Sequence, residues 1–216
     1  MEKILILGAA GEIAQFLTKR LVEETEFQLV LYGRNVSSRL PYEVSERLAY
    51  VNGSFEELDK LVEAMQGVDI VYLNAMEYLP HIETIVKAMQ QAGVSRFIGA
   101  SMAGVEGEVP DPLASWTRAN LPLSYINGEI ASANFIKSTA LDYTLLRLTW
   151  LYNDERKAQA YELIPSGVSF VSSEVSRQAV VSAILEILQA EPSKFSRKTV
   201  GIGEPNTNFG KPSFYE

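Results

Sequence analysis

The stretch "ILGAAGEIAQF", residues 6–16, joins a predicted strand to a predicted helix through a run of small residues. The apolar run "KILIL" (3–7) that leads into it is typical of a strand buried on both faces of a sheet. Large apolar residues then recur at helical spacing, at Ile13, Phe16, Leu17 and Leu21. The stretch therefore predicts a strand, a tight turn and a helix at the start of the fold.

Three small residues of this turn, Gly8, Gly11 and Ala14, follow the spacing G-x-x-G-x-x-A. Glycine at such a turn lets the backbone approach a pyrophosphate, which then lies on the N-terminus of the helix. A small residue one turn later lets the helix pack closely on the strand. An ordinary strand–helix turn is the alternative. The strand before the turn and the amphipathic helix after it favour a dinucleotide-binding loop.

The alternation of strands and helices continues along the chain. Further strands are predicted at 27–32, 47–53, 68–75, 95–101 and 142–148, and helices at about 58–65, 80–92, 124–139 and 180–187. Such alternation requires a parallel sheet with helices on both faces. We expect one NAD(P)-binding domain over residues 1–216, with an α/β, Rossmann-like, doubly wound fold in three α/β/α layers. The stretch 101–122, rich in Gly and Pro, is expected to form loops and, with 150–172, most of the substrate side.

Composition excludes several classes of site. The 216 residues carry a net charge of −8, which argues against a general nucleic-acid or membrane surface. The chain has no cysteine and a single histidine, so disulfides, thiolate nucleophiles and His-rich metal sites are excluded and no metal is expected. No signal peptide or membrane span is evident, and we expect a cytoplasmic monomer or homodimer whose partner is a small-molecule substrate.

The stretch "LYGRNVSSRL" (31–40) indicates which dinucleotide is bound. In NAD-binding domains an Asp or Glu about 20 residues after the glycines accepts hydrogen bonds from the ribose. No carboxylate ends this strand; Arg34 occupies that position, and Ser37, Ser38 and Arg39 follow. Guanidinium groups match phosphate oxygens, so the stretch predicts an NADP 2′-phosphate site and NADP(H) as cofactor. The alternative is a solvated loop whose arginines pair with Glu43 or Glu46.

With these motifs the sequence resembles the atypical short-chain dehydrogenase/reductases, in the group of small NAD(P)H-binding and NmrA-like proteins. "GRNVSSRL" (33–40) is similar to the NADP loop of the biliverdin-IX-beta/flavin reductases, and "RFIGASMAG" (96–104) to the strand that presents the active-site serine, here Ser101. The family's strand whose end contacts the nicotinamide is similar to "ALDYTLLRLTWLY" (140–152), and its late helix is similar to "EVSRQAVVSAILEIL" (174–188). The resemblance covers nearly the whole chain, and its motifs specify fold and cofactor better than reaction.

One departure from the family concerns the catalytic residues. Relatives use Tyr-x-x-x-Lys beside the serine, whereas here Tyr125 is followed four residues later by Glu129. Residues four apart share a helix face, and a glutamate there disfavours tyrosinate, so Tyr125 is not expected to act as a base near neutral pH. The predicted catalytic residues are Ser101 and Tyr125, with Tyr125 donating a proton or covering the nicotinamide. The alternative for Tyr125 is a half-buried helix tyrosine without a catalytic role.

The remaining candidates are assigned by their positions near strand ends. The full set of predicted cofactor-binding residues is Gly8, Ala10, Gly11, Glu12, Ile13, Arg34, Ser37, Ser38, Arg39, Ser54, Phe55, Asn74, Ala75, Met76 and Thr149. Ser54 stands where relatives often have Asp, which weakens the expected adenine contact. His81 is interpreted as a surface or capping residue, with an active-site role as the alternative. A flat substrate could pack on Tyr78, Trp116, Trp150 and Tyr152, which could equally be core residues.

The sequence leaves two main functions open. The first is an NADPH-dependent reductase of a flavin, a quinone or a similar conjugated acceptor, because hydride transfer to such a ring tolerates the loss of the lysine. The second is a non-catalytic NADP(H)-binding redox sensor, which is disfavoured by the lack of a basic helix or an extra domain. A sugar-nucleotide epimerase or dehydratase is a weaker third alternative, given the short substrate region and the missing lysine.

Overall fold

Strand β1 (Lys3–Leu7) lies inside the central sheet, and the turn after it leads into helix α1 (Glu12–Glu24), as the opening stretch predicts. The structure is a computed structural model that describes residues 2–215. Successive side chains of a strand point to opposite faces, and here Ile4 and Ile6 enter one core while Leu5 and Leu7 enter another. The central strand is apolar throughout because both of its faces are covered.

The central sheet has eight strands in the order β3-β2-β1-β4-β5-β6-β10-β8. All neighbours pair in parallel except β10 and β8, so the predicted parallel sheet is confirmed with one antiparallel edge strand added. A separate parallel pair joins β7 (Trp150–Tyr152) to β9 (Glu174–Ser176). The other strands are Gln28–Gly33 (β2), Leu48–Asn52 (β3), Ile70–Leu73 (β4), Arg96–Met102 (β5), Asp142–Leu148 (β6), Glu162–Pro165 (β8) and Lys198–Gly203 (β10).

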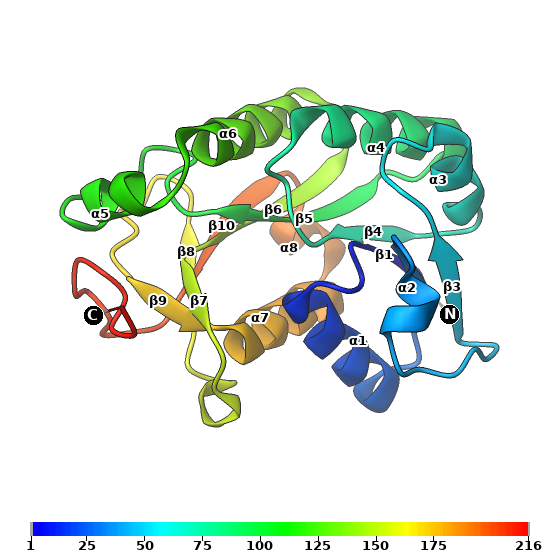
Figure 1. Ribbon diagram of the computed structural model, residues 1–216, viewed down its shortest axis with the longest axis horizontal. Helices are drawn as coiled ribbons and strands as arrows, with labels where there is room; N and C mark the ends of the chain where they lie inside the picture. The colour runs from blue at the N-terminus through cyan, green and yellow to red at the C-terminus, as the bar shows by residue number, and fades with distance from the viewer. Residues whose placement is uncertain (1, 216) are drawn as a thin grey trace.

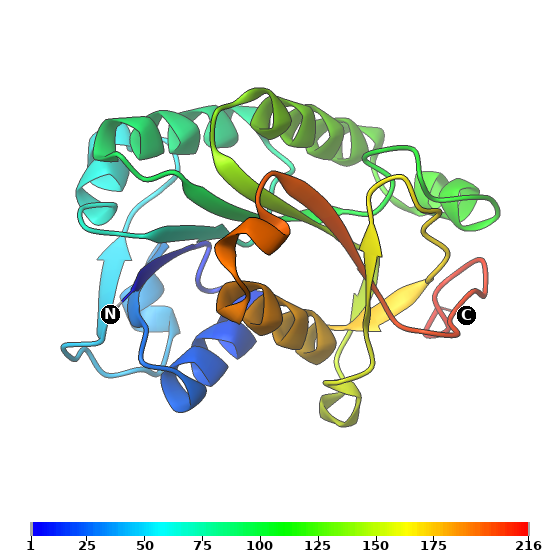
Figure 2. The ribbon, with the colours of Figure 1, turned by 180° about the vertical axis from the view of Figure 1, so that it is seen from behind.

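Helices cover both faces of the sheet (Figure 1). One face carries α3 (Leu58–Ala64), α4 (Leu79–Ala92) and α6 (Leu123–Ser138), and the other carries α1 packed against α7 (Arg177–Gln189). Figure 2 shows the same three layers from behind. The remaining helices are short: Val36–Arg39 (α2), Leu113–Asn120 (α5), Glu155–Lys157 (a 3-10 turn, η1) and Pro192–Phe195 (α8). The predicted three-layer α/β/α fold is confirmed.

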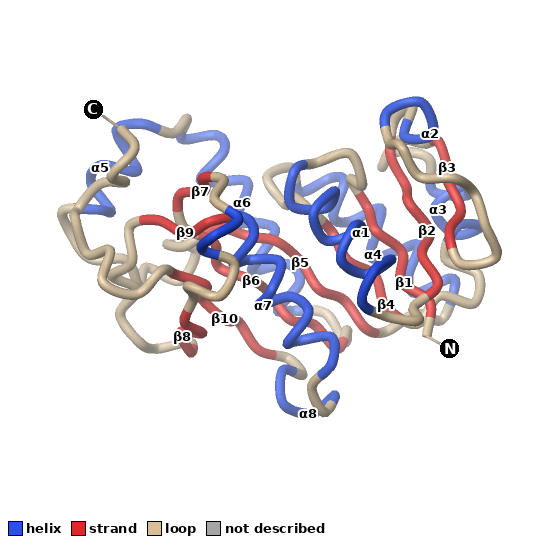
Figure 3. The backbone as a smooth tube through the Cα atoms, turned by 90° about the horizontal axis from the view of Figure 1, so that it is seen from below, coloured by secondary structure: helices blue, strands red, loops and turns tan. Residues whose placement is uncertain are grey.

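The chain reverses its direction of travel across the sheet beside β1. It first moves outward through β2 and β3, then returns to β4 on the other side of β1 and continues through β5 and β6 (Figure 3). In open α/β sheets such a reversal leaves a crevice outside the carboxyl ends of the strands, where ligands bind. The turn after β1 and the loop after β4 therefore face the expected binding crevice.

Several segments differ from the sequence-based expectation: the strands β7, β8, β9 and β10 were not expected, and part of the stretch 101–122 is helical. The stretch 101–122 is not entirely loop, because α5 forms within it; only Leu113 of this helix is buried, and the Gly and Pro residues that precede it favour a loop. Strand β10 was not predicted, since Gly201 and Gly203 give "KTVGIG" a weak strand signal. A Cβ at Gly201 would lie 2.6 Å from the Phe170 ring, so this glycine lets another segment pack directly on the strand.

None of the helices formed by residues 2–215 is long and apolar enough to cross a membrane.

Candidate functional site

The turn after β1 has the features of a phosphate-binding loop. Gly8 has φ +76°, in the left-handed region that favours glycine, and the N–H groups of Gly8 and Ala9 both donate to the Tyr32 carbonyl, at 3.0 and 3.1 Å. Gly11 precedes α1 without any side-chain cap, which leaves N–H groups at the helix N-terminus available to an anion. A Cβ at Gly11 would collide with the amide of Asn74, so glycine there lets the Asn74 side chain lie against the turn. These features fit a pyrophosphate.

A cavity of about 470 Å³ opens beside this turn, and we call it the arginine cavity. It lies along the ends of β1 and β2 and the start of the segment after β3. Its lining consists of Gly8, Ala10, Gly11, Gly33, Arg34, Arg39, Gly53, Ser54, Phe55, Glu56, Glu77 and His81. Seven predicted cofactor residues are thereby brought together in one cavity: Gly8, Ala10, Gly11, Arg34, Arg39, Ser54 and Phe55.

Both arginines of this cavity are exposed. The ion pairs formed among residues 2–215 include neither Arg34 nor Arg39, so the alternative in which they pair with Glu43 or Glu46 is not what the structure has. Two unpaired guanidinium groups on one cavity wall form a site suited to a phosphate monoester.

The two predicted serines lie beside this cavity but do not line it. The hydroxyl of Ser37 accepts a hydrogen bond from the Asn52 amide at 2.8 Å, and the Ser37 N–H donates to the same side chain at 3.1 Å. The Ser38 hydroxyl donates to the Asn35 carbonyl at 3.0 Å. The two Ser37 bonds join α2 to Asn52 at the end of β3, and the Ser38 bond lies within the turn at the start of α2.

Aromatic rings close the far end of the arginine cavity. Phe55 stacks on Tyr32 with centroids 6.1 Å apart and meets His81 edge-on at 5.6 Å, and His81 contacts Tyr78 at 4.6 Å. The structure therefore places His81 in a cavity wall rather than only on the surface. Tyr78 belongs to this group, away from the other aromatic residues that the sequence suggested as a substrate wall.

A second cavity, of about 330 Å³, lies at the carboxyl ends of β5 and β6, and we call it the serine cavity. Among its lining residues are the predicted Ile13, Asn74, Ala75, Ser101, Tyr125 and Thr149. Sequence reasoning missed several others: Ala100, Met102, Ala103, Val109, Leu113, Thr117, Leu121, Leu148, Leu151, Arg177 and Tyr215. Most of the missed residues are apolar and gave no chemical signal in the sequence.

Besides Ser37 and Ser38, two more predicted cofactor residues, Glu12 and Met76, line neither cavity. The Glu12 carboxylate forms an ion pair with Arg177 at 3.2 Å, which joins the start of α1 to the start of α7. Met76 is fully buried, and its sulfur packs so closely on Gly99 that a Cβ there would lie 2.5 Å away. A ligand bound near Glu12 or Met76 would therefore contact the backbone of these residues, because both side chains are already engaged in other contacts.

Ser101 and Glu129 form the polar centre of the serine cavity. The Ser101 hydroxyl donates to the Glu129 carboxylate at 2.9 Å, and both side chains are almost completely buried. Tyr125 lies one helical turn before Glu129 on α6 and is partly exposed to the cavity. A Cβ at Gly128 would collide with the Glu77 carbonyl, so this glycine lets α6 approach the loop after β4 and carry Glu129 inward.

Burial controls the electrostatics of this centre. It raises the pKa of Glu129 to about 7, with a further increase from the Glu77 charge, while hydrogen bonds from Ser101, the Met76 backbone and Tyr125 oppose the rise. Burial also raises the pKa of Tyr125 well above its ordinary value, and Glu129 and Glu77 add to this effect. The raised pKa of Tyr125 agrees with the expectation that it does not act as a base near neutral pH, and the pKa of Glu129 lies near neutral.

Three aromatic rings close the outer end of the serine cavity. Trp150 lines the cavity and donates its indole N–H to the Thr117 hydroxyl at 3.1 Å. Trp116 and Tyr215 pack edge-on against it, with centroids 4.6 and 5.3 Å away. Tyr215 comes from the C-terminal tail, which the sequence analysis did not connect with the site.

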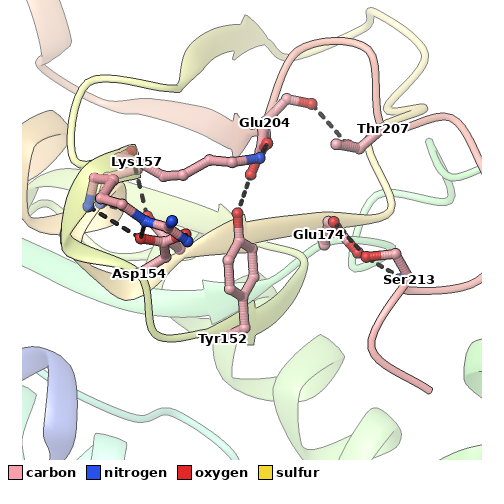
Figure 4. A network of polar contacts seen from close by, with 10 residues as sticks. Tyr152, Asp154, Lys157, Glu174, Glu204, Thr207 and Ser213 are labelled. Atoms are coloured by element: carbon pink, nitrogen blue, oxygen red, sulfur yellow. Dashed lines mark hydrogen bonds and ion pairs between the residues drawn. The ribbon is translucent and has the colours of Figure 1, made fainter.

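A polar network anchors that tail beside the cavity (Figure 4). The buried Glu174 carboxylate accepts hydrogen bonds from the hydroxyl and the N–H of Ser213, two residues before Tyr215. The neighbouring Glu204 binds the Tyr152 hydroxyl and pairs with Lys157. Tyr152 therefore serves this network and does not line the cavity.

Comparisons with known proteins agree with this geometry. Residues 8–191 match the family model described as NAD(P)H-binding. Two crystal structures of a short-chain dehydrogenase/reductase from Veillonella parvula match with TM-scores of 0.96 and 0.95, at 46% identity and with 99% of each chain covered; the second is in complex with NADP. A Rossmann-fold NAD(P)-binding family protein from Shigella flexneri matches over the whole of both chains, at 27% identity and a TM-score of 0.77. The comparison with curated proteins gives no match.

Proposed function

This chain belongs to the NAD(P)H-binding family of short-chain dehydrogenase/reductase proteins, and on that premise we propose that it uses NADPH to reduce a flavin, a quinone or a similar conjugated acceptor. The observation that carries the proposal is the serine cavity. It adjoins the phosphate-binding turn at Asn74, is walled by apolar and aromatic side chains, and holds a buried hydroxyl–carboxyl pair.

The preference for NADPH over NADH is supported by Arg34 and Arg39. Both guanidinium groups line the arginine cavity, and no carboxylate stands at the end of β2 to receive a ribose hydroxyl. The Veillonella parvula protein that is 46% identical to this chain has been crystallised with NADP. Gly8, Gly11 and the start of α1 would hold the pyrophosphate, and Asn74, Ala75 and Thr149 would border the nicotinamide.

The choice of acceptor is supported by what the serine cavity contains. Among residues 2–215 no lysine lines this cavity, and the raised pKa of Tyr125 removes the base that alcohol oxidation needs. Reduction of a conjugated ring spreads the incoming charge over the acceptor and requires less electrostatic help than formation of an alkoxide. When bound, the nicotinamide would supply the hydride; Ser101, Trp150 and the apolar lining would orient the acceptor and exclude water.

A steady-state screen tests this function. Purified protein is mixed with NADPH and a series of quinones, free flavins and secondary alcohols, and NADPH absorbance is followed, with NADH in parallel. We expect slow acceptor-dependent oxidation with quinones or flavins, a preference for NADPH, and little activity on alcohols. Tight NADPH binding with no turnover of any acceptor would instead favour a redox sensor of the NmrA-like kind, and robust alcohol oxidation would refute both functions.

A further inference from the structure

We propose that Ser101 and Glu129 form a proton-delivery pair, in which Glu129 holds a proton and Ser101 passes it to the reduced acceptor. This inference rests on the proposed reductase function. It assigns to Glu129 a role that is different from that of the lysine found at this place in relatives, and it takes the proton-donor role away from Tyr125.

The position of the pair carries the first part of the argument. Both residues line the serine cavity, yet Glu129 is only 1% exposed and Ser101 only 4%. The Ser101 hydroxyl lies at the carboxyl end of β5, lines the cavity, and is 2.9 Å from the Glu129 oxygen. A proton held on Glu129 therefore has a hydrogen-bonded route to the cavity through Ser101.

The charges around Glu129 carry the second part. From the loop after β4, the Glu77 carboxylate adds a negative charge; from its own helix, Tyr125 adds a neutral hydroxyl. Across the cavity, the Arg177 guanidinium is already paired with Glu12, and Tyr215 contributes a ring and a hydroxyl. Burial has the largest effect and, with the Glu77 charge, raises the pKa of Glu129 to about 7 against the hydrogen bonds from Ser101, the Met76 backbone and Tyr125. Protonated and ionised forms are therefore both populated near neutral pH.

The direction of the hydrogen bond changes with that ionisation. When Glu129 is ionised it can only accept, so the Ser101 hydrogen points at the carboxylate and is not available to a ligand. When Glu129 is protonated it donates to the Ser101 oxygen, and the Ser101 hydrogen is free to bond an acceptor in the cavity. The protonated pair therefore favours reduction, and the ionised pair favours the reverse reaction.

The proton balance of the reductive step follows from this arrangement. The acceptor gains two electrons and one hydrogen from NADPH, which becomes NADP⁺, and the negative charge settles on a ring oxygen or nitrogen. That atom takes the Ser101 proton, Ser101 takes the Glu129 proton, and Glu129 is left as a carboxylate. Water restores the proton to Glu129 before the next turnover.

The test compares pH profiles of kcat in wild type and in four variants. For wild type we expect kcat for reduction to fall as pH rises through about 7. Glu129→Gln keeps the size and a hydrogen bond but cannot titrate, so its profile should be flat in that range and its kcat lower by about 100-fold. Ser101→Ala should lose a similar factor. Tyr125→Phe should change kcat far less, and Glu77→Gln should move the midpoint to lower pH without abolishing it.

A second readout does not depend on turnover. Infrared difference spectra recorded during a pH titration should show a protonated carboxyl band that disappears near pH 7 in wild type and is missing in Glu129→Gln. NADPH affinity, measured by fluorescence, checks that each variant still folds and binds.

Four outcomes contradict the pair, and they are distinguishable. A Glu129→Gln profile with an unchanged midpoint overturns the proton-holding role while leaving the reductase function intact, as does a Tyr125→Phe loss of 100-fold or more. A carboxyl band that is the same in wild type and Glu129→Gln also overturns it. If the wild-type protein shows the carboxyl band but reduces no acceptor, the reductase function fails, and the proton-delivery step fails with it.

Discussion

The arginine cavity is lined entirely by residues between Gly8 and His81, whereas the serine cavity draws its lining from residues as far apart as Ile13 and Tyr215. The first is built by consecutive strand–helix units around the reversal point of the sheet. The second is assembled from α5, α6, the ends of β5 and β6, the start of α7 and the C-terminal tail. On the proposed function, recognition of the NADPH 2′-phosphate depends on the arginine cavity, and acceptor binding depends on the serine cavity, which also borders the nicotinamide through Asn74, Ala75 and Thr149. Changes to the two arginines should therefore leave acceptor binding measurably intact.

The largest predicted effect follows from removing the two positive charges of the arginine cavity. Charge-assisted hydrogen bonds contribute about 1.5–3 kcal/mol each, so Arg34→Ala with Arg39→Ala should weaken NADPH binding by about 100-fold or more. NADH binding should hardly change, because the lost partner is the 2′-phosphate. Isothermal titration of both cofactors measures this. Arg156→Ala, which removes an exposed arginine paired with Asp154, is the matched control. Equal losses for both cofactors would contradict the phosphate site.

The second prediction concerns the effect of the buried Glu129 carboxyl group on the stability of the folded protein at different pH values. The folded-state pKa of Glu129 is about 7, above the ordinary value of 4.5, so the folded chain binds this proton more tightly than the unfolded chain. Its contribution to stability is fully present below pH 4.5 and is lost as pH rises through about 7. Glu129→Gln does not show this loss. The difference in the free energy of unfolding between Glu129→Gln and wild type should therefore grow, in favour of the variant, by about 3 kcal/mol from pH 4 to pH 8.

Urea denaturation at a series of pH values measures that difference. Glu83→Gln, which alters an exposed glutamate of α4, is the control and should show no comparable trend. A stability gap between Glu129→Gln and wild type that does not widen with pH would show that folding does not raise the pKa of Glu129.

The third prediction tests the point where the two cavities touch. Gly11→Ala would push its new methyl group into the Asn74 amide, which lies between the phosphate turn and the serine cavity. Overpacking of this kind costs about 1–3 kcal/mol, so NADPH affinity should fall by roughly 5- to 150-fold. Adding Asn74→Ala should restore part of the affinity by removing the collision. No recovery in the double variant would place the strain elsewhere in the turn.

The smallest predicted effect concerns binding of the acceptor in the serine cavity. Tyr215→Ala removes one ring from the aromatic group beside the serine cavity, and aromatic contacts contribute about 0.5–1.5 kcal/mol beyond burial. We expect KM for a quinone or flavin to rise by roughly 2- to 12-fold with NADPH affinity unchanged. Glu174→Gln, which weakens the anchor of the tail at Ser213, should shift KM in the same direction. A change in NADPH affinity alone would contradict the division between the cavities.

The same division explains how much of the molecule could be predicted from the sequence. Strand–helix alternation, the glycine turn and Arg34 are patterns within short segments, and they predicted the fold and most of the arginine cavity. The family motif drew attention to Tyr125 and Glu129, but it predicted only an effect of Glu129 on Tyr125. The direct contact between the Ser101 and Glu129 side chains, 28 residues apart, appears only once the fold is formed.

The contribution of the C-terminal tail could not have been predicted in this way. Tyr215 approaches Trp150 because Ser213 binds Glu174, and each of these contacts joins residues tens of positions apart. The glycines of β10 also hide its strand character, since they are selected by the close approach of Phe170 and Ser172 rather than by strand propensity. Residues whose role is set by packing between distant segments leave no local pattern.

The most direct measurement is an anaerobic single-turnover experiment in which the NADPH-loaded protein is mixed with a quinone and the loss of NADPH absorbance is followed. We predict stoichiometric oxidation that slows when NADPH is deuterated at the transferred position and slows about 100-fold in Ser101→Ala. Stable NADPH absorbance with every quinone and flavin tried, despite tight binding, would contradict reduction of an acceptor in the serine cavity.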